Sequence, residues 1–139
     1  MKVIRLIAIC LLMAPATILS AQSSLTVEIV NIENNKGVVI VDIVDQNDES
    51  VTDQSAKIVD KKCTIVFKDL KKGTYAIRFF HDENSNEELD MNFLGIPKEG
   101  FGFSNDAIGK FGPKDFSEWL FEVSGDTKIK LKTYYMFKK

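Results

Sequence analysis

The sequence has few cysteines: two in 139 residues, Cys10 and Cys63. Cys10 lies inside an N-terminal apolar run that we expect to be removed, which leaves Cys63 as the one cysteine of the rest of the chain. A lone cysteine forms no intrachain disulfide. The fold must therefore depend on its core, and a hydrophobic content of 45% with ten phenylalanines can supply one.

Clusters of positive charge are also missing. The formal net charge is −2, and the loss of Lys2 and Arg5 with the N-terminal segment would make it more negative. Binding to a phosphate backbone needs clustered Lys and Arg, so we expect no nucleic-acid partner. We interpret the alternating lysines of residues 128–132 as a solvated strand face that discourages edge-to-edge pairing.

Long apolar runs are confined to the N-terminus, where residues 6–15 follow two basic residues and lead to small residues and then a polar stretch. This order is typical of a secretory signal peptide, and the run is too short to cross a bilayer core of about 30 Å. We predict that residues 1–21 are a signal peptide cleaved after Ala21. Residues 22–139 would then form one exported domain, periplasmic or extracellular, with no stable membrane span.

Alternating apolar and polar residues predict β-strands along most of this domain. The expected strands are residues 24–32, 38–44, 61–70, 74–82, 119–124 and 128–137. The polar residues 45–56 predict a loop. Because turn signals separate the strands and no amphipathic helix of useful length is present, we expect an all-β, single-domain antiparallel β-sandwich of immunoglobulin-like or transthyretin-like type.

The connection from Asp82 to Trp119 is the most unusual part of the chain, since loops beyond about 12 to 15 residues are mostly functional or disordered. Glycines alternate in it with Phe93, Phe101, Phe103, Phe111 and Phe116. We expect one long ordered loop that packs as a lid on the sandwich end, either to close the core or to bind a ligand.

A binding surface on this loop would take an unknown protein or glycan as its partner. The candidate ligand-binding residues are His81, Phe93, Phe101, Phe103 and Asn105. A glycan-binding module would use Trp119 or Phe101 as a stacking platform.

The front of the loop carries oxygen-bearing side chains at the early offsets of a calcium-binding loop. The candidate ligands are Asp82, Asn84, Asn86, Asp90 and the carbonyl of Glu88. The pattern has two departures: Glu87 stands where glycine makes the sharp turn, and Phe93 replaces the bidentate carboxylate, so Asp90 or Glu99 would have to supply it. The alternative is an asparagine-rich turn whose side chains bond to their own backbone.

Catalytic constellations are weak in this sequence. Cys63 and His81 would face each other if the strands that carry them formed a hairpin, but a buried cysteine without a cationic neighbour is usually inert. Ser104 lacks a nucleophile-elbow context, and the acids Asp82, Asp90 and Glu99 fix no catalytic geometry. We therefore favour a non-catalytic module, with a small hydrolase that uses residues 81–105 as the alternative.

The stretch "YAIRFFHDENSNEELDMNFLGIPKEGFGFSNDAIGKFGPKDF" resembles the signature of the exported bacterial proteins grouped as domain of unknown function 2141. The resemblance extends over nearly the whole chain after the signal peptide. It departs at Glu87, where the family favours glycine, and at Lys114, where a second proline is frequent. The resemblance implies an exported β-sandwich and no particular activity. The sequence thus predicts an exported binding module, stabilised by calcium in residues 82–90.

Overall fold

The computed structural model describes residues 23–137, so the expected signal peptide, its cleavage site and Cys10 lie outside the described residues. The described chain is all β apart from two short 3-10 turns, η1 (Ser104–Asp106) and η2 (Phe116–Glu118). Its strands are β1 (Ser23–Val30), β2 (Val38–Asp45), β3 (Ser50–Lys57), β4 (Cys63–Leu70), β5 (Gly73–Asp82), β6 (Phe101–Phe103), β7 (Ile108–Gly109), β8 (Gly112–Pro113), β9 (Phe121–Val123) and β10 (Thr127–Lys132). Within residues 23–137 no helix has the length and apolar character needed to cross a membrane.

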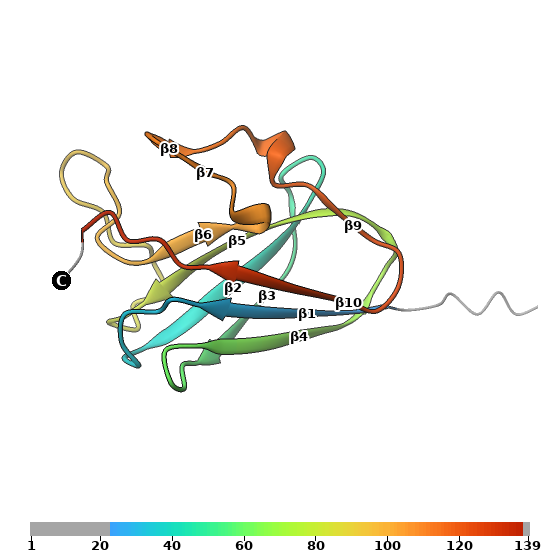
Figure 1. The fold of residues 1–139 in the computed structure, drawn as a ribbon, viewed down its shortest axis with the longest axis horizontal. Coiled ribbons are helices and arrows are strands. Elements are labelled where there is room, and N and C mark those ends of the chain that lie inside the picture. The colour runs from blue at the N-terminus through green and yellow to red at the C-terminus, as the bar shows by residue number, and fades with distance from the viewer. Residues whose placement is uncertain (1–22, 138–139) are drawn as a thin grey trace, which may run out of the picture.

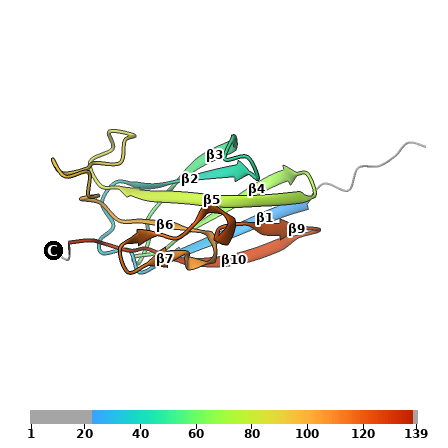
Figure 2. The same ribbon diagram turned by 90° about the horizontal axis from the view of Figure 1, so that it is seen from above.

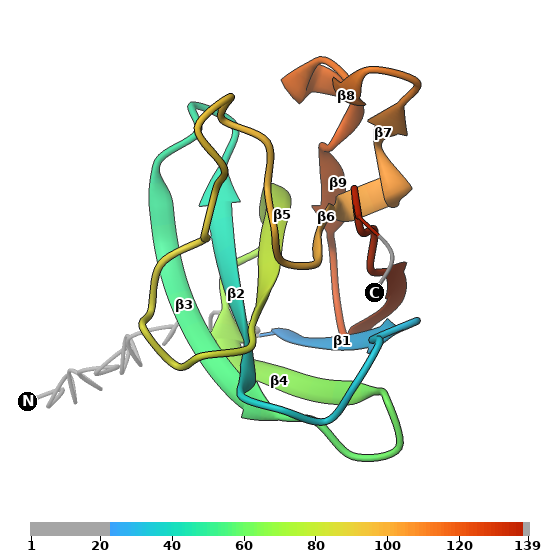
Figure 3. The ribbon, with the colours of Figure 1, turned by 90° about the vertical axis from the view of Figure 1, so that its left-hand side faces the viewer.

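Eight of the strands form two facing sheets, which confirms the predicted β-sandwich (Figure 3), and β7 and β8 form a separate two-stranded sheet. One sheet has the order β10-β1-β4, and the other has the order β3-β2-β5-β6 with β9 also paired to β5. The pairing is antiparallel except between β1 and β10, which run parallel. That parallel pair was not predicted from the sequence.

The core lies between the two sheets and comes from the inward positions of each strand. The larger inward residues are fully buried, and they include Leu25, Val27, Ile29, Val39, Val41, Ile43, Phe67 and Ile77. Each such side chain contributes about 1.5–3 kcal/mol by leaving water. Alternation in the sequence predicts the inward residues of β1, β4 and β5, whereas the apolar run of β2 did not distinguish its two faces.

The tight connections after β1 and β4 cross from one sheet to the other, and this overturns the hairpin that would have paired Cys63 with His81. Cys63 instead lies opposite Ile29 of β1, while His81 lies opposite Val39 of β2. Turn residues mark where the chain reverses but carry no information on which sheet the next strand enters. The Cys63–His81 pair is therefore not a catalytic dyad.

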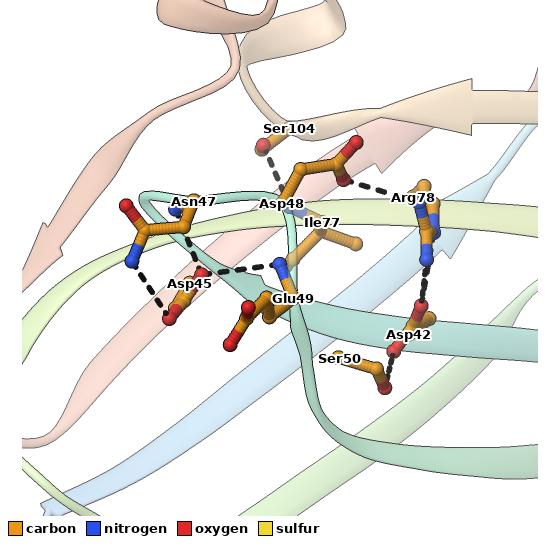
Figure 4. Close-up of polar contacts among 9 residues, drawn as sticks. All are labelled: Asp42, Asp45, Asn47, Asp48, Glu49, Ser50, Ile77, Arg78 and Ser104. Carbon is orange, nitrogen blue, oxygen red and sulfur yellow. Dashed lines mark hydrogen bonds and ion pairs between the residues drawn. The ribbon is translucent and has the colours of Figure 1, made fainter.

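Residues 45–56 are not the loop that their polarity predicted, because residues 50–57 form the edge strand β3. This strand pairs with β2 and exposes most of its side chains, so it has no apolar alternation to signal it. The turn before it is held by Asp45, whose Oδ1 accepts backbone N–H groups from Asn47 and Glu49 at 2.8 and 3.1 Å (Figure 4). Edge strands of this polar kind resist pairing with other chains.

Two short strands, β6 and β9, follow one another along the same side of β5 (Figure 2). β6 pairs with residues 78–80 of β5, and β9 pairs with residues 73–75. At the gap between them Ser104 Oγ accepts the backbone N–H of Ile77 at 2.9 Å and donates to the carbonyl of Trp119. The Ser104 hydroxyl therefore supplies the hydrogen-bond acceptor that the backbone of a neighbouring strand would otherwise give to Ile77.

The outer face of the five-stranded sheet is covered at one end. Val44 and Ala76 have the outward parity of their strands and are opposite each other, yet both are fully buried. In Figure 1 residues 104–120 run over this side of the sheet. The other end of the same face, at Ile40 and Phe80, is only half-buried.

Cys63 should be chemically inert in the folded protein. Its side chain lies in the core, and burial raises the pKa of its thiol to about 11. We expect Ellman's reagent at pH 8 to leave Cys63 unmodified over an hour in native protein and to modify it fully in urea, as located by peptide mass spectrometry.

The matched control is the double variant Cys63→Ala/Thr64→Cys, which moves the thiol to the exposed face of the same strand. It should react within minutes. Prompt labelling of Cys63 in native wild-type protein would show that the thiol is accessible and would reopen the cysteine-nucleophile alternative.

Candidate functional site

Residues 82–90, which we call the acidic loop, follow directly on β5. They are organised around Asp82, which is fully buried. Its two carboxylate oxygens accept the backbone N–H groups of Asn86 at 3.1 Å and Glu87 at 2.9 Å. Burying a carboxylate is tolerated when its oxygens are hydrogen-bonded. Asp82 thus fixes the loop by binding its backbone.

The other predicted calcium ligands converge near Asp90. Its carboxylate accepts N–H groups from the side-chain amides of Asn84 at 2.6 Å and Asn86 at 3.2 Å. The amide oxygens of these asparagines accept backbone N–H groups within the loop, as in an asparagine-rich turn. A cation at this point would require the two amide groups to turn.

The far side of the loop is closed by Glu99, which is buried. Its carboxylate accepts the backbone N–H of Glu83 at 2.9 Å and that of Asp90 at 3.1 Å, so it joins the two ends of the loop. The Glu88 side chain points to solvent. Within residues 23–137 no group of three or more His, Cys, Asp or Glu side chains is arranged to hold a metal ion, and calcium stays a prediction.

The His81 side chain is fully buried, and its backbone N–H donates to the carbonyl of Gly100 at 2.7 Å, next to Phe101. Its Nε2 contacts the carbonyl of Lys36 at 2.7 Å, and its Nδ1 contacts the hydroxyl of Tyr135 at 2.8 Å. The Tyr135 hydroxyl also accepts the backbone N–H of Glu33, and burial raises its pKa to about 12. Both ring nitrogens of His81 are therefore engaged in holding the structure together.

The aromatic residues of the long loop divide into two groups. Phe103 stacks on Trp119 with ring centroids 4.0 Å apart, and Phe116 meets the same indole edge-on at 5.4 Å. Phe93 and Phe111 are instead 94% exposed. The prediction of a packed lid is thus correct for the first group and wrong for these two, which lie at the tips of turns.

Both exposed tips belong to small hairpins. In residues 90–98, Asn92 Oδ1 accepts the backbone N–H groups of Leu94 and Ile96 at 2.9 and 3.0 Å, which fixes the turn that presents Phe93. Phe111 lies between β7 and β8. In Figure 1 the hairpin of residues 90–98 projects at the left-hand end of the molecule, and β7 and β8 lie above β6.

Asn105 joins two segments of the long loop by hydrogen bonds. Its side-chain amide donates to the carbonyls of Glu118 and Leu120, each at 3.0 Å, and its φ is 58°. Together with Ser104 it ties η1 to the segment that enters β9. Of the five predicted ligand-binding residues, Phe101 and Phe103 contact each other edge-on, with ring centroids 6.0 Å apart.

Phe101 and Phe103 line a hollow on the uncovered part of the outer face, which we call the outer trough. Its volume is about 460 Å³. Its apolar residues from strands β2, β5 and β6 and from the acidic loop include Ile40, Phe80, Leu89, Phe101 and Phe103. Its polar residues are Asp42, Ser50, Asp53 and Arg78.

The polar wall of the outer trough is organised around Arg78 (Figure 4). The guanidinium donates twice to Asp42, at 2.8 and 2.9 Å, and once to Asp48 at 3.1 Å. Ser50 Oγ donates to the second oxygen of Asp42 at 2.6 Å. This network links β2, β5 and the turn before β3.

Sequence reasoning missed the outer trough, although one signal for it was present. Ile40, Val44 and Phe80 place apolar side chains on the outward parity of strands whose inward face already supplies the core. Strands with apolar residues on both faces are covered, or bind something, on both. The partners on β3 and β6 gave no such signal, because neither strand was predicted.

The backbone of the acidic loop stores strain at Glu87, whose φ of 63° is the left-handed conformation expected where glycine would stand. This conformation costs a non-glycine residue about 1–2 kcal/mol, which exceeds the entropic penalty of glycine. We expect Glu87→Gly to raise the free energy of unfolding by about 0.5–1 kcal/mol in urea titrations. Glu88→Gly, at the adjacent position without a positive φ, should lower it by a similar amount; equal effects of the two substitutions would contradict the strain.

Comparisons with known proteins place the chain in a family. A family model described as "Uncharacterized protein conserved in bacteria (DUF2141)" matches residues 27–130. Searches of curated proteins and of solved structures gave no match. The matched region begins in β1 and ends in β10, so it contains the acidic loop and the outer trough. The chain therefore belongs to the DUF2141 family of bacterial proteins.

Proposed function

We propose that this chain is an exported, non-catalytic binding module whose ligand lies in the outer trough. The trough is the observation that carries the proposal. Its volume of about 460 Å³ and its apolar floor with a few oriented polar groups are typical of ligand sites. The proposal of export rests on the N-terminal sequence pattern alone.

The states of the candidate catalytic groups support a non-catalytic role. Cys63 is buried with a raised thiol pKa, and both nitrogens of His81 are hydrogen-bonded. Ser104 Oγ uses its hydrogen to bond Trp119 and accepts the N–H of Ile77. A catalytic nucleophile needs a base within hydrogen-bond reach. Burial of Cys63 and the hydrogen bonds of His81 and Ser104 therefore argue against the hydrolase alternative.

The glycan-binding alternative keeps only part of its support. Trp119 stacks on Phe103, meets Phe116 edge-on and donates its Nε1–H to the carbonyl of Lys114 at 3.1 Å. Its packing against these partners makes it a poor stacking platform. Phe101 lines the outer trough, so a sugar ring that stacked on it would occupy the same place as the apolar group of any other ligand.

A neutral aromatic probe should bind the outer trough at one site. We expect N-phenyl-1-naphthylamine to gain fluorescence on titration with the wild-type protein, with a one-to-one end point. Ile40→Trp should weaken this binding at least about tenfold, because the indole would fill the trough and displace the probe from its apolar contacts. A loss of about 1.4 kcal/mol of binding free energy is enough for a tenfold change.

The control is Val66→Trp, which adds the same ring on the outward face of β4, at a position that is 42% exposed on the other sheet. It should bind the probe as the wild-type protein does. Equal affinity of the Ile40→Trp and Val66→Trp variants, or the lack of saturable binding to wild type, would sink the proposed site.

We also propose that calcium binds the loop from Asp82 to Asp90 and stabilises the fold. The proposal is supported by the closeness of the Asn84 and Asn86 amide groups to the Asp90 carboxylate, because turning the two amides would point their oxygens to one side of it. We expect a dissociation constant of about 10⁻⁴ to 10⁻³ M, as in extracellular modules. At calcium about 100-fold above that constant, binding adds about 2.7 kcal/mol and raises the melting temperature by roughly 10 °C.

Two single-charge variants test the position of the ion. Asp90→Asn should abolish the calcium-dependent rise, because it removes a ligand carboxylate. Glu88→Gln should retain it, because this residue would contribute its carbonyl and its side chain is exposed. Magnesium should substitute poorly, since it demands a tighter octahedron. No change in melting temperature between saturating calcium and chelator would show that the loop is an asparagine-rich turn only.

A further inference from the structure

The charges around the outer trough are unbalanced. Asp42 and Asp53 are direct cross-strand partners on its wall, and like charges in this arrangement repel each other. Arg78 neutralises Asp42 at 2.8 Å. The Asp53 side chain makes no hydrogen bond or ion pair with residues 23–137, although its backbone pairs with Asp42 in the sheet. The sheet therefore holds one unpaired carboxylate at the edge of an apolar hollow.

Arg78 is poorly placed to attract an anion. Its three donor contacts go to Asp42 and Asp48. One positive charge therefore faces two negative charges, and Asp53 adds a third negative charge to this wall. Within residues 23–137 it is the one basic side chain that lines the outer trough. The local field therefore favours a cationic ligand and disfavours an anionic one.

The apolar part of the surface extends beyond the outer trough. Leu89 of the trough lies just before the hairpin that presents Phe93, and Phe103 lies just before the segment that leads to Phe111. Both tips are 94% exposed, and in Figure 1 the hairpin of residues 90–98 projects at the left-hand end while β7 and β8 lie above β6. A ligand that covers the tips as well as the trough must be longer than a single small molecule.

We infer that the outer trough binds an extended polypeptide segment that carries lysine or arginine beside apolar side chains. This inference rests on the proposed function. The cationic group lies at the Asp53 carboxylate, and the apolar side chains lie on Phe80, Phe101 and the exposed tips. Phenylalanine faces also attract ammonium and guanidinium groups, which reinforces the same preference.

Three peptides of equal length test the inference by isothermal titration calorimetry with the full chain from residue 22. Their sequences alternate phenylalanine with lysine, glutamine or glutamate, with blocked ends. We expect the lysine peptide to bind at least tenfold more tightly than the glutamine peptide and the glutamate peptide to show no binding. The advantage of the lysine peptide should shrink in high salt, because exposed charges are screened.

Two variants locate the charge preference. Asp53→Asn should remove the advantage of the lysine peptide over the glutamine peptide, and it disturbs no hydrogen bond of the described chain. Asp60→Asn removes one negative charge from an exposed turn elsewhere, at a φ of 50° that asparagine tolerates. It should leave the advantage unchanged.

The remaining outcomes separate this inference from the proposed function. Equal binding of the lysine and glutamine peptides, or loss of the preference in both variants, would overturn the charge assignment while the trough stands. Binding of cellohexaose with no binding of any peptide would replace the polypeptide by a glycan. If the peptides fail and the neutral probe still binds, the ligand class is wrong; if the probe fails too, the proposed function falls with it.

Discussion

The hydrogen bond between Ser104 Oγ and the backbone N–H of Ile77 is the contact on which the path of the chain across the end of β6 depends. β5 needs a partner along its whole length, but β6 ends before β9 begins. A buried N–H left unpaired at this gap would cost about 1–3 kcal/mol. Ser104 supplies the missing acceptor with a side chain, and the backbone is then free to leave the sheet.

The segment that leaves the sheet there decides which part of the outer face is open. It is anchored by Ser104, by the Asn105 amide and by the Phe103–Trp119 stack. Val44 and Ala76, at one end of the outer face, are fully buried, while Ile40 and Phe80 line the outer trough at the other end. Gly102 contributes as well, because a Cβ there would lie 2.4 Å from the Phe79 ring and would push β6 off β5. The trough is therefore a product of how the face is partly covered.

The sequence predicted what depends on local chemistry. Alternation identified the inward residues of β1, β4, β5 and β10, whereas β2 was recognised only as an apolar run. The glycine-like position of Glu87 predicted its left-handed backbone. Side-chain period is a property of each strand by itself. The same holds for the asparagine-rich turn, whose bonds join near neighbours in the chain.

The sequence did not predict what depends on strand pairing over long separations. β3 has no apolar alternation, and β6 is only three residues long. Neither strand could therefore be predicted from its own sequence, and each is recognised only by its pairing with β2 or β5. The Asp42–Asp53 pair and the Arg78 network exist only in that register. Phe93 and Phe111 were misjudged because an aromatic residue in a glycine-rich segment suits a packed turn and an exposed tip equally well.

Methyl chemical shifts would test most directly whether the open half of the outer face is the binding site. Ile40 and Val44 lie on the same face of β2, one lining the trough and the other fully buried. In ¹H–¹³C spectra of methyl-labelled protein titrated with N-phenyl-1-naphthylamine, the account predicts a saturable shift of the Ile40 methyls, with the methyls of Val44 and Val66 unchanged. Shifts that are absent at Ile40, or that appear equally at Val66 on the other sheet, would contradict it.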